Sequence, residues 1–251
     1  MEDKKDIITY DNQQERSLRD EMIELLDECP IPRDQLLSNL GLFLNSKNLS
    51  RILFMNHIYQ KIVDVQGVVF EFGTRWGQNV ALFSALRGMY EPFNRHRKIV
   101  AFDTFEGFPS IHEKDGNSSM MKPGMLTLTE EYEKFLEKVL LNIERDNPLG
   151  HINKFELRKG DATEQIVSYL EKNPETIVSL AYFDFDLYEP TKKCLEAIKP
   201  RLTKGSVVAF DELNDPDSPG ETLALMEVFG LENVKLKRHP HTSRVSYFIV
   251  E

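Results

Sequence analysis

From residue 68 to the last residue, short apolar runs alternate with longer segments in which apolar residues recur every three to four positions. The runs are rich in Val, Ile and Phe and predict strands, whereas the longer segments predict helices. Strands are predicted at 68–72, 98–103, 154–159, 177–184, 205–210, 233–238 and 244–250. Helices are predicted near 77–90, 129–146, 161–172, 188–200 and 219–229. This alternation is typical of an α/β fold built on a parallel sheet.

The last two predicted strands are joined only by a turn that contains Pro240. Because two parallel strands need a much longer crossover, this pair is expected to form an antiparallel hairpin. A long loop, 104–128, follows the second strand and is long enough to act as a functional lid.

Before the first strand, the pattern of apolar residues is helical. The positions that show it are Leu18, Met22, Leu25 and Leu26, followed by the segments 36–43 and 52–63. We therefore predict a helical extension or cap over residues 1–65 and an α/β domain over residues 66–251. Such a cap covers a ligand crevice or forms a dimer face, so a homo-oligomer, a dimer or larger, is expected.

Acidic residues follow two of the most apolar predicted strands. Asp184 and Asp186 end one strand, and Asp211 and Glu212 end the next. In an open α/β sheet, ligands bind beyond the carboxyl ends of the strands, so these side chains are expected to share one crevice. A site made only of oxygen ligands favours magnesium, calcium or manganese, and magnesium is the cation we predict. Helix capping and plain surface solvation are the alternatives.

The ends of the first three strands predict a second ligand. Glu71, Gly73 and Gly77 form a strand-to-helix turn in which glycine lets the backbone approach a ligand. Asp103 ends the second strand, where a carboxylate can accept from both hydroxyls of a ribose. Asp161 follows the third strand and could accept from an adenine amino group or cap the next helix. Together these endings favour an adenosine-containing ligand over a tight turn with capping residues alone.

Composition narrows the classes of partner. The chain has 251 residues and a formal net charge of -10, which argues against nucleic-acid binding. Its two cysteines, Cys29 and Cys194, form no CxxC spacing and indicate neither a disulfide framework nor a zinc site. No signal core and no apolar run of membrane-spanning length is present, so a cytoplasmic protein without a membrane partner is expected.

With these motifs, the chain resembles the class I S-adenosylmethionine-dependent methyltransferases, and among them the macrocin O-methyltransferase group, which methylates sugar hydroxyls. The resemblance covers about residues 66 to 250. The segments that carry it are Glu71–Gly73, Phe102–Pro109, Gly160–Asp161, Phe183–Thr191 and Gly205–Glu212.

The resemblance implies a Rossmann-like seven-stranded sheet of order 3-2-1-4-5-7-6, with its last strand antiparallel and helices on both faces. It assigns residues 66–251 to a methyltransferase domain. It also implies that S-adenosylmethionine is held by Glu71, Gly73, Thr74, Gly77, Asp103 and Asp161, and a divalent cation by Asp184, Asp211 and Glu212. Many relatives carry a second Asp where this chain has Glu212. Metal-dependent catechol-type relatives carry a lysine base where this chain has Leu187.

Methyl transfer to a sugar hydroxyl requires activation of the acceptor, because this hydroxyl is a poor nucleophile at neutral pH. A cation that lowers its pKa and a nearby base that takes its proton are the expected aids. The predicted catalytic residues are Asp184 and Asp186, with Asp186 the first candidate base and His239 and His241 the second.

We therefore predict a magnesium-assisted O-methyltransferase that acts on a small-molecule sugar or nucleotide sugar. Nucleotide-linked rhamnose is the preferred acceptor, and a glycosylated natural product or a surface glycan is the other kind of sugar substrate. Two alternatives remain open: a methyltransferase for a catechol-like small molecule, and a non-catalytic protein that binds S-adenosylmethionine for assembly.

Overall fold

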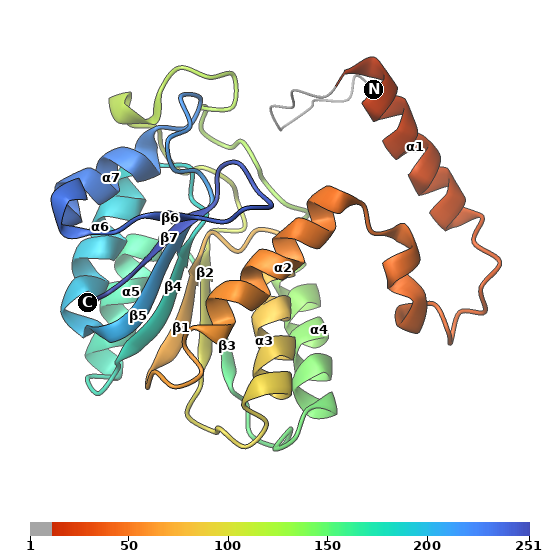
Figure 1. Cartoon of the computed structure of the whole chain (residues 1–251), viewed down its shortest axis with the longest axis horizontal. Coiled ribbons are helices and arrows are strands. Elements are labelled where there is room, and N and C mark those ends of the chain that lie inside the picture. The colour runs from red at the N-terminus through yellow and green to blue at the C-terminus, as the bar shows by residue number, and fades with distance from the viewer. Residues whose placement is uncertain (1–11) are drawn as a thin grey trace.

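The computed structural model describes residues 12–251, so residues 1–11 of the predicted extension lie outside the described residues. Within this range the protein forms one seven-stranded sheet of order β3-β2-β1-β4-β5-β7-β6 (Figure 1). The strands are β1 (Val68–Phe72), β2 (Ile99–Asp103), β3 (Phe155–Lys159), β4 (Val178–Phe183), β5 (Leu202–Phe210), β6 (Lys237–Arg238) and β7 (Ser246–Ile249). All neighbours pair in parallel except β7, which is antiparallel to both β5 and β6. The predicted fold class, strand order and final hairpin are confirmed.

Helices cover both faces of the sheet (Figure 1). One face carries α5 (Ala162–Lys172), α6 (Tyr188–Ile198) and α7 (Gly220–Phe229). The other carries α2 (Ser46–Gln60), α3 (Gln78–Tyr90) and α4 (Tyr132–Asp146). The remaining elements are α1 (Gln13–Asp27) and the short 3-10 helices η1 (Leu37–Phe43), η2 (Glu113–Asp115), η3 (Lys199–Arg201) and η4 (Leu231–Asn233).

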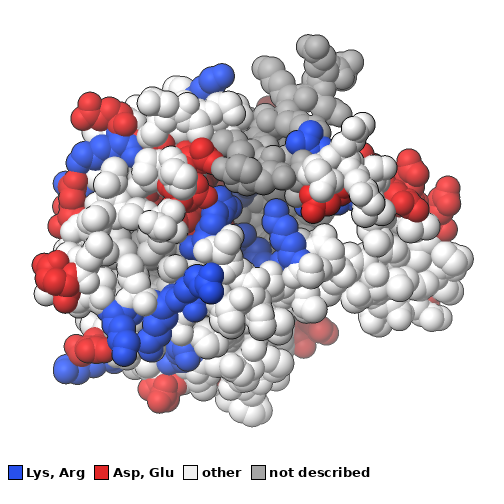
Figure 2. Space-filling model, turned by 45° about the horizontal axis from the view of Figure 1, so that its top comes forward, with Lys and Arg blue, Asp and Glu red and all other residues white. Residues whose placement is uncertain are grey.

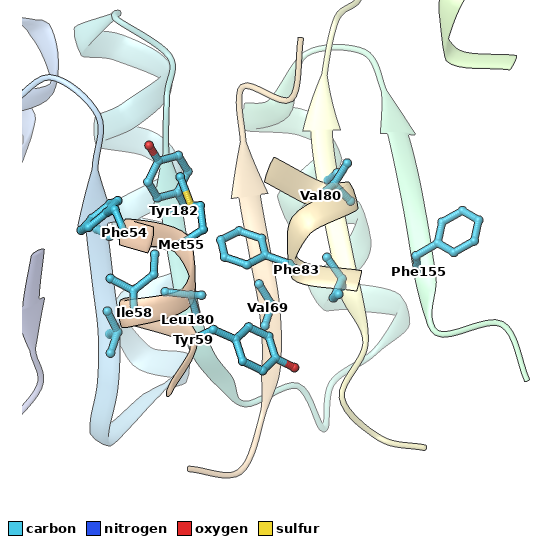
Figure 3. Close-up of a cluster of buried hydrophobic side chains, with 14 of the residues drawn as sticks. Phe54, Met55, Ile58, Tyr59, Val69, Val80, Phe83, Phe155, Leu180 and Tyr182 are labelled. Carbon is cyan, nitrogen blue, oxygen red and sulfur yellow. The ribbon is translucent and has the colours of Figure 1, made fainter. Parts of the chain in front are cut away.

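Helix α2 belongs to the core of the α/β unit although it lies within the predicted extension. Its side chains Phe54, Met55 and Ile58 are fully buried, and Figure 3 shows them packed against Leu180 and Tyr182 of β4. In contrast, α1 and η1 contain no buried residue. In Figure 1 these two elements extend away from the sheet, beyond the start of α2. The part of the extension that stands apart from the core is therefore the segment before α2.

Three local predictions differ from the structure. The segment predicted as a helix at 36–43 is the 3-10 helix η1, and α2 begins at Ser46, because the Asn45 side chain caps it by accepting from the backbone of Asn48. The strand predicted at 233–238 contains only the two residues of β6: η4 ends at Asn233, and residues 234–236 form no regular secondary structure. None of the helices in residues 12–251 is long and apolar enough to cross a bilayer.

Candidate functional site

A cavity of about 1300 Å³ opens at the carboxyl ends of the strands. Its walls come from the turns after β1, β2, β3, β4 and β5, from the β6–β7 hairpin, and from α1 and α2. Figure 2 shows Lys and Arg side chains gathered in the hollow on this face, beside acidic side chains. The topology explains the location, because the carboxyl ends of parallel strands all meet at one edge of the sheet.

Strand register brings the predicted cofactor and metal residues into one row. Four phenylalanines at the ends of adjacent strands are paired in register: Phe102, Phe72, Phe183 and Phe210. Their rings stack with centroids 4.6 to 5.3 Å apart. Each is followed by a residue at the cavity wall, in the order Asp103, Gly73, Asp184 and Asp211. The aromatic stack therefore holds the predicted cofactor turn directly beside the predicted metal ligands.

The turn after β1 is built around Gly73, which has a φ of +89°. A Cβ atom there would lie 1.9 Å from the backbone oxygen of Asp184, so the β1 and β4 ends approach each other closely only because this residue is glycine. The carboxylate of Asp103 accepts from the backbone amides of Arg75 at 2.7 Å and Phe105 at 2.6 Å. Asp103 thereby holds the turns after β1 and β2 together and faces the cavity.

Glu71 lies just behind this turn. It is fully buried, and within the described residues neither of its carboxylate oxygens has a hydrogen-bond partner. Burial raises the pKa of Glu71 well above its ordinary value, and Asp184 and Asp103 raise it further. A buried polar group without a partner is costly, but Glu71 does not line the cavity, so its contact with the cofactor stays a prediction.

The other residues predicted for the cofactor take different positions. Thr74 is buried and lines the cavity, whereas Gly77 precedes α3 with a φ of +80° and does not line it. Asp161 also lines the cavity, and its side chain caps α5 by accepting from the amide and the hydroxyl of Thr163. Of the two roles considered for Asp161, capping is the one seen in the structure. Contact with adenine stays a prediction.

The three predicted metal ligands come together. One carboxylate oxygen each of Asp184, Asp211 and Glu212 lies within 4.8 Å of the others. The guanidinium of Arg51, from α2, contacts Asp184 Oδ2 at 2.7 Å and Asp211 Oδ1 at 3.0 Å. Burial, followed by repulsion from Asp211, raises the pKa of Asp184 to about 8. A second oxygen of Glu212, Oε2, is buried and accepts no hydrogen bond within residues 12–251.

Asp186 lies beside this carboxylate cluster. It is buried, lines the cavity and adopts a left-handed backbone conformation with a φ of +60°. Burial raises the pKa of Asp186, while hydrogen bonding with Glu212 opposes the shift. Burial and the charge of Asp186 raise the pKa of Glu212 well above its ordinary value.

His239 and His241 do not line the cavity. The His239 ring is buried between α2 side chains, with its centroid 5.4 Å from that of Phe54 and 5.2 Å from that of His57. Burial lowers the pKa of His239. The structure thus places Asp186 in the cavity and leaves the two histidines outside its lining.

The similarity of this protein to solved structures is extensive. CalS11, a calicheamicin methyltransferase, has 42% sequence identity over 96% of this chain and 94% of that chain, with a TM-score of 0.93. A second CalS11 structure, the apo form of this TDP-rhamnose 3'-O-methyltransferase, has 40% identity over 96% of each chain and a TM-score of 0.85. The chain belongs to the methyltransferase family of CalS11.

A more distant neighbour, the O-methyltransferase NovP, shares 18% identity over 80% of this chain and 79% of that chain, with a TM-score of 0.58, and supports the fold alone. No family model and no curated protein matches the sequence. The predicted family, fold and methyltransferase activity are confirmed, and the reading as a non-catalytic protein is not supported.

Sequence reasoning missed several residues of this methyltransferase site. Arg51 contacts two predicted metal ligands, and Arg244 lies 2.9 Å from Glu212 Oε1. The hydroxyl of Tyr182 donates to Asp211, and the buried Glu221 accepts from the backbone amide of Phe185. Tyr182 and Glu221 carry a weak signal, because each is a polar residue in an apolar element. Arg51 carries none, since it lies 133 residues from Asp184 on a helix that resembles any amphipathic helix.

Proposed function

We propose that this methyltransferase transfers a methyl group from S-adenosylmethionine to a sugar hydroxyl, with a divalent cation, magnesium, assisting. The observation that carries the proposal is the single row formed by Asp103, Gly73, Asp184 and Asp211 at the wall of one cavity. This row brings a turn suited to a methyl donor next to carboxylates suited to an acceptor hydroxyl.

The residues around the β1 turn fit S-adenosylmethionine. The absence of a side chain at Gly73 leaves the backbone open, and Asp103 offers a carboxylate at the cavity wall to ribose hydroxyls. When bound, the cofactor supplies an electrophilic methyl group on a sulfonium.

The acidic cluster fits a hard divalent cation. It offers only oxygen ligands, and one of them, Glu212 Oε2, is buried and accepts no hydrogen bond from any described residue. When bound, the cation lowers the pKa of the acceptor hydroxyl. For it to bind, the Arg51 guanidinium has to release at least part of its contact with Asp184 and Asp211, because it touches these same carboxylates.

Within this arrangement, Asp184 and Asp211 orient the acceptor end of the cavity and Asp186 takes the proton. The new bond forms between the methyl carbon and the hydroxyl oxygen, the bond from methyl to sulfur breaks, and the hydroxyl proton passes to Asp186. Because its pKa is raised, Asp186 accepts a proton more readily than an ordinary aspartate does. The preferred acceptor is a nucleotide-linked deoxysugar such as rhamnose, in line with CalS11 as a TDP-rhamnose 3'-O-methyltransferase.

The cofactor half of this proposal is tested by melting temperature. S-adenosylhomocysteine, the product form of the cofactor, should raise the melting temperature, because a ligand that binds only the folded state stabilises it. Asp103→Ala should reduce the shift, whereas Asp146→Ala, at the exposed end of α4, should keep it. The acceptor half is tested by a one-methyl mass gain on TDP-rhamnose. A wild-type protein whose melting temperature is unchanged by S-adenosylhomocysteine would contradict the proposal.

Magnesium binding should strengthen as the pH rises from 6 to 8. The pKa of Asp184 is raised to about 8, so below this pH the carboxyl holds a proton that the cation must displace. For one displaced proton, affinity should rise by up to about tenfold per pH unit. Calorimetry in two buffers of different ionisation enthalpy measures both the affinity and the released proton. An affinity that is independent of pH, with no proton released, would show that the cation displaces no proton from Asp184 and would contradict this prediction.

We further propose that the segment before α2 mediates a homo-oligomer and covers the cavity. In α1, the polar residues Arg16, Arg19 and Asp20 line the cavity of the same chain. The apolar residues of α1, Leu18, Met22, Leu25 and Leu26, are each 40% exposed or more. Because exposed apolar surface of this extent favours association, a second copy of the chain is the occupant we assign to it.

Light scattering after gel filtration tests this association. The wild-type protein should be a dimer or larger, and the double variant Met22→Glu/Leu25→Glu should shift toward the monomer. Glu24→Gln, on the same exposed helix, should leave the mass unchanged. A monomeric wild-type protein at micromolar concentration would contradict the assignment.

A further inference from the structure

The cavity is larger than one ligand requires. Its volume of about 1300 Å³ exceeds the range of roughly 300–1,000 Å³ typical of sites for a single small molecule. The turns after β1, β2 and β3 form one part of the wall, where the proposed cofactor residues lie. A different part comes from α1, the first turn of α2 and the β6–β7 hairpin. The cavity therefore has room for an acceptor considerably larger than one sugar ring.

This second part of the wall is rich in basic side chains. Arg16 and Arg19 of α1, Lys47 of α2, Arg238 of β6 and Arg244 of the hairpin all line the cavity. They contrast with a formal net charge of -10 for the whole chain. In Figure 2, Lys and Arg side chains are gathered in the hollow of this face. A local concentration of positive charge in an acidic protein points to an anionic ligand.

Some of the basic side chains at the cavity wall already pair with carboxylates. Arg244 pairs with Glu212 and Asp215, much as Arg51 pairs with Asp184 and Asp211. By contrast, within residues 12–251 no ion pair is formed by Arg16, Lys47 or Arg238. Their charges are thus available at the cavity wall, whereas those of Arg51 and Arg244 balance the carboxylate cluster.

We propose that Arg16, Lys47 and Arg238 form the subsite that binds the diphosphate of a nucleoside diphosphate-linked sugar. The inference rests on the proposed function and adds the residues that recognise the acceptor. A diphosphate presents several charged oxygens, which guanidinium and ammonium groups bind through charge-assisted hydrogen bonds. With the diphosphate at the basic wall, the attached sugar extends toward Asp184 and Asp186, where the methyl group is delivered.

The subsite also gives α1 a function in the chemistry. Arg16 belongs to a helix with no buried residue, so its position at the cavity is not explained by packing in the core. The two other members come from α2 and from the final hairpin, far apart in sequence. Acceptor binding would thus tie three separate segments together across the cavity mouth.

Calorimetry with thymidine diphosphate, thymidine and inorganic pyrophosphate tests the subsite. Thymidine diphosphate should bind the wild-type protein at least tenfold more tightly than thymidine, and its affinity should fall with added salt. Arg16→Gln and Arg238→Gln should each weaken it by about tenfold, the usual effect of losing one charge-assisted hydrogen bond. Arg33→Gln, an exposed arginine outside the cavity lining, should not change it. Pyrophosphate alone should also bind if the recognised group is the diphosphate rather than the nucleoside.

Steady-state kinetics distinguishes a role of Arg16 in binding the diphosphate from a purely structural role. On a diphosphate-linked sugar, Arg16→Gln should raise KM about tenfold with kcat nearly unchanged, and Arg16→Lys should restore most of the loss. Equal affinity of thymidine and thymidine diphosphate, or variants that bind thymidine diphosphate as the wild type does, would overturn the subsite. Failure to bind S-adenosylhomocysteine would instead overturn the proposed function, so the two failures are distinguishable.

Discussion

Asp184→Asn should lower kcat/KM for methyl transfer by at least about 10³-fold. The substitution keeps the size of the side chain but removes a carboxylate that lies within 4.8 Å of Asp211 and Glu212. A bound cation contributes several kcal/mol of charge stabilisation, and each 1.36 kcal/mol corresponds to a factor of ten in rate. Initial rates at saturating S-adenosylmethionine measure the loss, and calorimetry should show weakened magnesium binding in parallel.

Two further measurements distinguish a loss of metal-assisted catalysis from a loss of cofactor binding or of stability. S-adenosylhomocysteine should bind Asp184→Asn almost as well as the wild type, since the contact at the cofactor turn involves the backbone of residue 184. The metal-free melting temperature should change little, because the amide oxygen of Asn can still accept from Arg51 and the loss of the charge removes the repulsion from Asp211. Asp146→Asn is the matched control, at an exposed position outside the cavity. Activity within tenfold of wild type would contradict the assignment of Asp184.

Gly73→Ala should both destabilise the protein and abolish cofactor binding. The new Cβ would lie 1.9 Å from the backbone oxygen of Asp184 at a φ of +89°. Left-handed strain costs about 1–2 kcal/mol and overpacking about 1–3 kcal/mol, so a loss of about 3 kcal/mol is expected. This loss corresponds to a fall of about 6–12 °C in melting temperature. Because relief of the clash pushes the β1 and β4 ends apart, S-adenosylhomocysteine should no longer raise the melting temperature.

Substitutions of two other glycines distinguish backbone strain from the steric clash as the cause of the lost stability. Gly124 also has a positive φ of +78°, but nothing lies within 4 Å of an added Cβ, so Gly124→Ala should show the strain alone. Gly41 has neither a positive φ nor a neighbour within 4 Å, so Gly41→Ala should be nearly neutral. If Gly73→Ala loses no more stability than Gly124→Ala, the close approach of β1 and β4 does not constrain the turn.

Most of the fold was predictable because each central element carries its own periodic signal. The strand β4 is buried along its whole length and reads as a continuous apolar run. Helices α3 to α7 carry recurring apolar positions, and their bounds agree with prediction to within three residues, whereas α2 begins at Ser46, well before the predicted segment 52–63. The prediction was wrong where local pattern is a poor guide: η1 has helical apolar spacing but forms a 3-10 helix, and only two residues of the strand predicted at 233–238 pair as β6.

The site was predictable where the topology alone places a residue. Asp103 is the last residue of its strand and Asp184 and Asp211 directly follow theirs, so knowledge of a parallel sheet suffices to place them at one edge. No such rule applies to a side chain that reaches the site from elsewhere. Arg51 reaches the carboxylates only because α2 packs on the sheet through Phe54 and Ile58, a contact that no local sequence pattern encodes.

The sequence by itself determined the alternation of strands and helices, the terminal hairpin and the acidic and glycine-containing strand ends, because each is a property of neighbouring residues. Tertiary structure alone decided which charges pair at the site and which side chains line the cavity. It paired Arg51 and Arg244 with the carboxylates, placed the His239 ring against α2 rather than in the cavity lining, and brought Arg16 to the cavity wall. The physical reason is that charge pairing and burial depend on distances between segments remote in the chain, which are set only when the helices pack on the sheet.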